Sequence, residues 1–162
     1  MAEVEKADLH GGAVVISKEE IDRVLAQPLI ARIATVGKDM QPHVVPVWFW
    51  WDGESMYMET GINYRKAQNL RENPKCAVIV DETKGGLRFW GIFMEGEVEL
   101  ITEPVDWVRD IVLRIYQNYL GAEGIEAPTP QTMINAEHVI IKFTPKKFIT
   151  WNDTRHAIAP IG

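Results

Sequence analysis

The sequence lacks the features that mark secreted and membrane-spanning proteins. Its 162 residues include a single cysteine, Cys76, so no disulfide can form within the chain. Cys76 begins the apolar run CAVIV, where a small buried thiol is commoner than a nucleophile. No apolar helical run is long enough to cross a bilayer, and the N-terminus lacks the basic-then-apolar order of a signal peptide. We therefore expect a cytoplasmic protein that does not attach to a membrane.

Positive charge is also in short supply. The chain has 17 Lys and Arg against 23 Asp and Glu, for a formal net charge of −6. This balance gives no electrostatic support for a nucleic-acid partner. The length and ordinary composition predict one globular domain over residues 1–162, with residues 1–14 as a loose lead-in.

Motifs for catalysis and metal binding are missing as well. No Gly-x-Gly-x-x-Gly or Walker loop is present, and no paired acid and base stands out. The histidines at positions 10, 43, 138 and 156 lack metal-ligand spacing. Catalytic residues therefore stay unassigned, and we expect no metal site.

What the chain does have is an informative stretch over residues 42–73. Asp52-Gly53 lies between two apolar runs, which predicts a hairpin with strands 42–51 and 54–60. The first strand is apolar on both faces, so both need cover, and Pro46 predicts a sheet edge or opening. Of its four consecutive aromatics, residues 48–51, we expect at least two in the core or a dimer interface and at most one on a cofactor ring.

A short helix follows the hairpin and begins with two cations. We expect Asn63 to be its N-cap and Asn73-Pro74 its end. Arg65 and Lys66 then lie in the first turn, where the helix dipole is already positive. A phosphate at this point would be held by free N–H groups and both side chains. The residues alone leave open the alternative that both cations are simply solvated.

The remaining chain predicts a mainly β protein with flanking helices. Ser17 and Glu20 form a capping box that starts a helix before Pro28. An amphipathic helix over residues 104–120 ends at Gly121. The other predicted elements are strands 29–37, 75–81, 87–101 and 138–143, a strand extension at 148–151 after a turn, loops at 82–86 and 122–131, and a helical turn at 132–136.

The order hairpin, Thr60-Gly-Ile-Asn-Tyr-Arg65-Lys66, short helix, Asn-Pro and strand resembles the pyridoxamine 5′-phosphate oxidase-like family. These proteins are FMN-binding split barrels, with deazaflavin (F420) and haem-utilising branches. The resemblance covers about residues 15–151 and is most specific over 42–74. Three positions depart from the oxidase proper: Glu59 replaces an aromatic, Tyr64 replaces a serine, and the segment at Arg88 lacks an Arg-Gln pair.

The resemblance implies a split β-barrel homodimer with a cofactor site at the subunit interface. It implies an oxidoreductase that uses FMN, or alternatively F420 or haem, to act on an unknown small molecule; another alternative is a non-catalytic flavin-binding sensor or carrier. Trp151 and Arg155 match the oxidase's C-terminal Trp and Arg only loosely, and a surface tail is an equal alternative. The cofactor-binding residues implied are Val44, Val45, Pro46, Val47, Trp48, Thr60, Arg65, Lys66 and Trp151.

Overall fold

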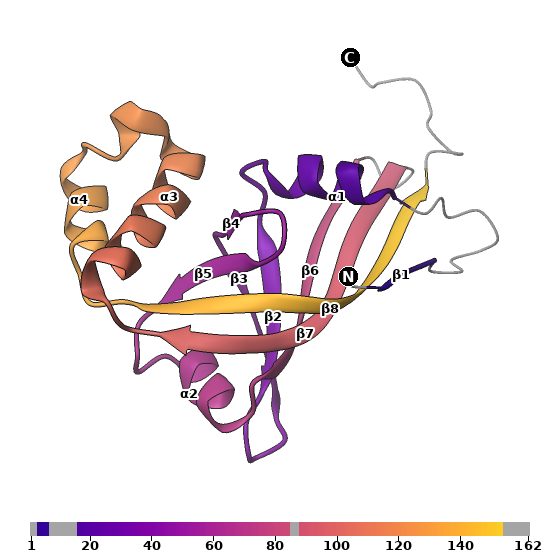
Figure 1. Ribbon diagram of the computed structural model, residues 1–162, viewed down its shortest axis with the longest axis horizontal. Coiled ribbons are helices and arrows are strands. Elements are labelled where there is room, and N and C mark those ends of the chain that lie inside the picture. The colour runs from indigo at the N-terminus through magenta and orange to yellow at the C-terminus, as the bar shows by residue number, and fades with distance from the viewer. Residues whose placement is uncertain (1–2, 7–15, 85–87, 154–162) are drawn as a thin grey trace.

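The computed structural model describes residues 3–6, 16–84 and 88–153, whose strands form one curled, mostly antiparallel sheet with flanking helices (Figure 1). The sheet order is β3-β2-β6-β7-β8-β5-β4, and β1 pairs in parallel with β8. The elements are β1 (Glu3–Lys6), α1 (Lys18–Leu25), β2 (Ala31–Val36), β3 (Pro42–Val47), β4 (Trp50–Trp51), β5 (Met56–Thr60), α2 (Arg65–Glu72), β6 (Lys75–Lys84), β7 (Arg88–Ile101), α3 (Val105–Gly124), α4 (Pro128–Ile134) and β8 (Val139–Asp153).

The sheet is split between its two end strands. β3 and β4 lie at opposite ends of the strand order, yet only Trp48 and Phe49 separate them in the chain. So short a link keeps both edges close, and the sheet must therefore curl into a barrel that opens there. The backbone N–H of Phe49 donates to the Tyr119 hydroxyl at 3.1 Å instead of continuing the strand. The predicted mainly β split barrel is confirmed.

The Asp52-Gly53 turn forms as predicted and joins β4 to β5. Asp52 Oδ1 accepts hydrogen bonds from the backbone N–H groups of Glu54 and Ser55 at 2.8 and 2.7 Å. Gly53 has φ +101°, a backbone conformation that suits glycine. Burial alone would raise the pKa of Asp52, but these N–H groups and the Tyr57 hydroxyl outweigh it and lower the pKa. The charged carboxylate therefore fixes the turn.

Two hydrophobic clusters lie on the two faces of β5. Met56 and Met58 point into the barrel with the first cluster, whereas Tyr57 packs outside against α3 with the second. Figure 1 shows α3 and α4 together at one end of the sheet, with α2 on the opposite side from α1. This alternation along β5 sends Glu59 to the same side as Tyr57.

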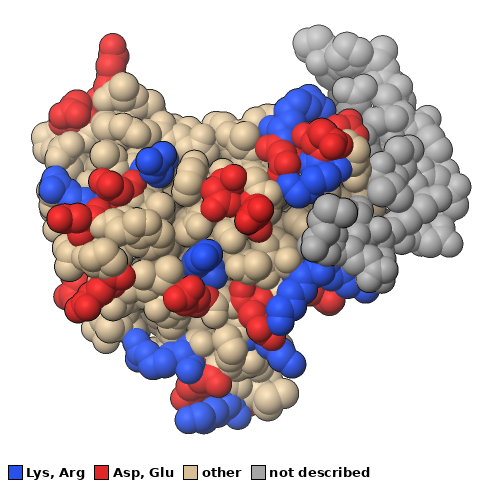
Figure 2. Space-filling view, in the orientation of Figure 1, with Lys and Arg blue, Asp and Glu red and all other residues tan. Residues whose placement is uncertain are grey.

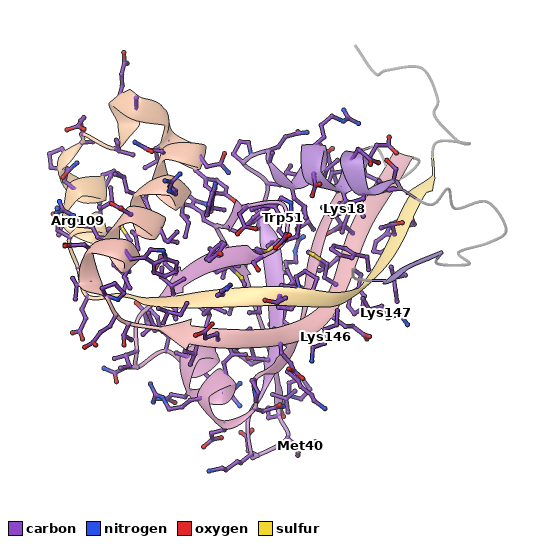
Figure 3. The ribbon with its side chains drawn as sticks, viewed as in Figure 1. Lys18, Met40, Trp51, Arg109, Lys146 and Lys147 are labelled. Atoms are coloured by element: carbon purple, nitrogen blue, oxygen red, sulfur yellow. The ribbon has the colours of Figure 1, made fainter. Side chains whose placement is uncertain are left out.

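The α1 helix begins with the predicted capping box, in which Ser17 and Glu20 bond reciprocally. Its Asp22 accepts a 2.8 Å hydrogen bond from the Trp51 indole N–H and pairs with Lys18. The Lys18 ammonium lies 5.6 Å from the centre of the Trp51 ring, as the neighbouring side chains in Figure 3 illustrate. These contacts attach α1 to β4 beside the split.

Several predicted boundaries were wrong. The expected strand 42–51 breaks at Trp48 and Phe49, and its first part pairs with β2, not β5. Residues 3–6, expected in a loose lead-in, form β1. The strand expected to end at residue 143 continues as β8. A bulge opposite Glu95 and Gly96 takes the place of the expected turn and keeps the strand paired. Helix α4 starts at Pro128, inside the expected loop, because proline fits a first helical turn.

The remaining predicted elements occur in the structure, with small differences in their bounds. β6 extends to Lys84, three residues beyond the expected end, and residues 85–87 lie outside the described residues. The long strand expected over 87–101 is β7. The amphipathic helix is α3, whose regular geometry breaks at Gly121 with φ +70°. Phe49 and Trp51 are buried, as expected for at least two of the four aromatics.

Candidate functional site

A cavity of about 420 Å³ opens at the split. One wall is the last part of β3 and the link to β4, and the other is formed by α3 and α4. Glu59 from β5 and Lys66 from α2 supply the charged groups. The lining residues are Pro46, Val47, Trp48, Glu59, Lys66, Tyr116, Leu120, Thr129, Pro130 and Met133. A mostly apolar cavity with a few convergent polar groups is the usual form of a small-molecule site.

Lys66 is the cation of this cavity. Its ammonium lies 5.1 Å from the centre of the Tyr64 ring, and it forms no ion pair with any described residue. Desolvation by burial lowers the pKa of Lys66, and the Glu59 charge partly opposes that shift. An anionic ligand group would offset the desolvation cost, so the residue fits a phosphate-bearing cofactor.

The start of α2 differs from the prediction in one respect. Tyr64, not Asn63, is the N-cap, because the turn closed by the Tyr64 N–H and the Gly61 carbonyl at 3.1 Å delays the helix by one residue. Tyr64 makes no side-chain capping bond, and no acidic residue occupies the first turn. The first N–H groups of α2 are therefore not capped by the Tyr64 side chain.

The structure brings four of the implied cofactor-binding residues to the cavity, namely Pro46, Val47, Trp48 and Lys66. Arg65 points elsewhere and pairs with Asp39 at 3.0 Å, on the surface. Thr60 is buried, and its hydroxyl lies 3.4 Å from the Gly61 carbonyl oxygen.

The remaining implied residues lie outside the cavity of their own chain. Val44 is 59% exposed on β3, and its neighbour Val45 packs against the barrel core. Trp151 lies near the far end of β8, opposite Gly91 of β7. Arg155 lies outside the described residues.

The sequence analysis missed the pair between Glu59, which lines the cavity, and His138, which lies outside the cavity lining. His138 Nδ1 lies 3.1 Å from Glu59 Oε2, and His138 Nε2 lies 2.7 Å from the Met133 carbonyl oxygen. The Met133 carbonyl oxygen accepts, and an ionised Glu59 accepts as well, so this pair of contacts favours the doubly protonated imidazolium ring. The bond to Glu59 is the main cause of the raised pKa of His138, with burial acting in the opposite direction. The one local signal was a carboxylate at position 59, where the resembling family has an aromatic.

Aromatic side chains make the cavity wall rigid. Trp48 stacks on Tyr119 with ring centres 4.6 Å apart and meets Tyr116 edge-on at 5.4 Å. The Tyr119 hydroxyl accepts from the Phe49 N–H and donates to the Leu29 carbonyl. Burial raises the pKa of Tyr116 and of Tyr119 to about 12, so both phenols stay neutral at physiological pH. Trp48 is therefore held by its neighbours and does not need a ligand to order it.

The rest of the described chain offers no competing reactive centre. Burial raises the pKa of Cys76 to about 12, which keeps its thiol protonated. No group of three or more metal-ligating side chains occurs in residues 3–6, 16–84 and 88–153. In the same ranges, no helix has the length and hydrophobicity needed to span a bilayer. Figure 2 shows acidic and basic side chains intermixed over the visible face.

Comparison with solved structures places the chain in the split-barrel class. A conserved hypothetical protein from Mycobacterium tuberculosis superposes with a TM-score of 0.77 at 23% identity, covering 93% of this chain and 94% of that one. An F420 reductase is 28% identical with a TM-score of 0.62, covering 78% and 94%. An FAD-binding protein from Mesorhizobium loti is 21% identical with a TM-score of 0.62, covering 86% and 96%.

The model of the pyridoxamine 5′-phosphate oxidase family matches residues 17–152. The chain therefore belongs to that family, as the resemblance implied. A search of curated proteins found no match. Proteins sharing this fold thus include one named for F420 reduction and one named for FAD binding.

Proposed function

We propose that this protein is an FMN-binding oxidoreductase that acts as a homodimer on a small molecule. The observation that carries the proposal is the half-buried Lys66 ammonium, which has no ion-pair partner among the described residues and faces the same cavity as Pro46, Val47 and Trp48. A desolvated cation beside an apolar, aromatic-walled space suits a ligand with a flat ring and an anionic tail.

The chain's own residues would hold and orient such a ligand. Lys66 and the start of α2 would take the phosphate, with Arg65 and Thr60 in support as the resemblance implies. The segment from Val44 to Trp48 would lie along the ring, and Trp151 would reach the site from the other subunit. The chemistry supplied by a bound flavin is hydride or electron transfer at its N5 atom. This division of labour accounts for the absence of a catalytic motif in the sequence.

A homodimer would complete the site. β3 is an edge strand, and its residues alternate between exposed and half-buried positions, with Val44 among the exposed ones. An edge strand with exposed apolar side chains needs cover from a second surface. The cavity opens beside this edge, so a partner packed there would enclose the ligand.

F420 is a second candidate cofactor because the F420 reductase is 28% identical and this chain covers 94% of its length. F420 also carries a phosphate, so Lys66 does not distinguish it from FMN. Haem has less support, since His138 does not line the cavity and both of its ring nitrogens already contact Glu59 and the Met133 carbonyl. The absorption spectrum of the purified protein, with the released cofactor identified by mass, separates these cofactors.

The decisive experiment measures FMN affinity in Lys66→Ala. Loss of a charge-assisted contact should weaken binding by at least about tenfold. Lys38→Ala is the matched control, because Lys38 is 81% exposed and pairs with Glu72 outside the cavity. Equal affinity in Lys66→Ala and wild type would refute the phosphate assignment.

Turnover needs a separate assay. Bound FMN should be reduced by NADPH, NADH or another physiological donor and reoxidised by the substrate. If no donor reduces it, the protein binds flavin as a sensor or carrier, and the enzymatic part of the proposal fails.

A further inference from the structure

The cavity contains a carboxylate that phosphate binding does not explain. Glu59 lines the same space as Lys66, and a negative charge there works against holding a phosphate nearby. On β5 the position belongs to the face where Tyr57 packs against α3, so an apolar residue would suit the location better. Glu59 therefore needs a role of its own.

The carboxylate is held in place by its partner. The ring of His138 spans Glu59 Oε2 and the Met133 carbonyl oxygen, and the His138 side chain is only 8% exposed. His138 immediately precedes β8, whose first residue, Val139, pairs with Thr60, while Met133 lies near the end of α4, so the pair joins the sheet to the helical wall. Because the His138 ring is held between the Met133 carbonyl and Glu59, it fixes where the Glu59 side chain points.

One oxygen of Glu59 is left for a ligand. Oε1 has no hydrogen-bond partner among the described residues, and the side chain is 25% exposed. No fully buried side-chain oxygen in the described chain lacks a partner, so Oε1 is accessible rather than sealed in the protein, and Glu59 lines the cavity. An ionised carboxylate accepts hydrogen bonds and donates none. It therefore selects a ligand edge that carries an N–H or O–H and rejects an anionic one.

We propose that Glu59 recognises the ring of the bound cofactor by accepting a hydrogen bond from its imide N–H, and that His138 is the residue that positions Glu59. This inference rests on the proposed function and extends it, since flavin and deazaflavin rings both present such an N–H. Lys66 and Glu59 then divide the ligand between them, the ammonium taking the anionic tail and the carboxylate taking the ring edge.

The test compares FMN with FMN methylated at the imide nitrogen, which cannot donate this hydrogen bond. Wild type should bind FMN at least about tenfold more tightly than the methylated compound, as expected for a hydrogen bond to a charged group. In Glu59→Ala, which also makes room for the methyl group, the two affinities should become nearly equal. Glu97→Gln is the control, because Glu97 lies on β7 outside the cavity, where it pairs with Lys146 of β8, and this variant should discriminate as wild type does.

An unchanged affinity ratio in Glu59→Ala overturns the inference while leaving FMN binding intact. Failure of wild type to bind FMN at all refutes the proposed function and this inference with it. If Glu59→Ala does not fold, Glu59→Gln keeps the shape with a neutral acceptor, and its ratio should fall by about fivefold.

His138 is tested by conservative rescue. His138→Gln keeps a donor for Glu59 and should retain most of the discrimination between the two ligands. His138→Leu fills similar space without a donor and should lose it. Equal ratios in the two variants would limit His138 to packing and remove its positioning role.

Discussion

At the scale of single residues, the cavity places an ammonium and a carboxylate in one apolar space without pairing them. The sequence pattern drew attention to Lys66 because a cation in a first helical turn is unfavourable. It could not reveal the Glu59–His138 pair, whose members lie 79 positions apart and meet only because β5 pairs with β8. The substitution of a carboxylate for an aromatic at position 59 was visible, but its partner was not.

The Glu59–His138 pair makes stability depend on pH. The pKa of His138 is raised in the folded state, so its stabilising effect is complete below the ordinary value of 6.5 and is lost as pH rises through the folded value. His138→Leu should therefore cost about 1.5–3 kcal/mol at mildly acidic pH and less at alkaline pH. Urea unfolding of both proteins across this range measures the difference. A cost that does not vary with pH would contradict an imidazolium at position 138.

Tyr119 packs against Trp48 in the cavity wall and holds the backbone next to it. Its hydroxyl links the Phe49 N–H to the Leu29 carbonyl, at the point where the sheet splits. Tyr119→Phe keeps the stacking on Trp48 but leaves both backbone groups without this partner, so it should destabilise the fold by about 1–3 kcal/mol. Denaturant unfolding measures the loss. Tyr64→Phe is the control, since Tyr64 is 63% exposed, and a similar cost in both would show that the Tyr119 bridge contributes nothing specific.

At the scale of elements, local chemistry predicted turns and caps better than strand ends. The Asp52-Gly53 turn and the Ser17–Glu20 capping box formed as expected because each is fixed by backbone bonds over a few residues. The break at Trp48 and Phe49 was missed because no glycine or polar residue marks it. It depends on a bond to Tyr119, which is 70 positions away.

The bulge between β7 and β8 could not be predicted from local sequence either. Gly96 lies against the Thr144 backbone so closely that an added Cβ would sit 2.3 Å from the Thr144 carbonyl oxygen. Gly96→Ala should therefore destabilise the protein by about 1–3 kcal/mol, because backbone atoms must move apart. Thermal or denaturant unfolding measures this, with Glu99→Ala, exposed on the same strand, as the control. Wild-type stability in Gly96→Ala would mean that the bulge is looser than the structure shows.

At the scale of the whole molecule, the edge of the sheet at β3 is the surface that a second subunit would cover. Both end strands of the barrel lie at the split, and the exposed face of β3 carries Val44 between Pro42 and Pro46. The prolines cannot donate ladder hydrogen bonds, so a partner would cover this edge with side chains rather than add a strand. The sequence indicated this edge through Pro46 and through the two-faced apolar run, but a pattern of exposed valine does not identify what covers it.

Val44→Glu tests the proposed homodimer. Val44 is 59% exposed in the single chain, so a charged replacement should leave the subunit folded while introducing a desolvated carboxylate into the interface. We expect a monomer by light scattering, together with weaker FMN retention, because the partner would no longer close the cavity. Val105→Glu is the matched control: Val105 is 71% exposed and begins α3, where an acidic residue suits the helix dipole. A dimeric Val44→Glu would move the interface away from β3, and a monomeric Val44→Glu with full FMN affinity would show that one subunit holds the cofactor alone.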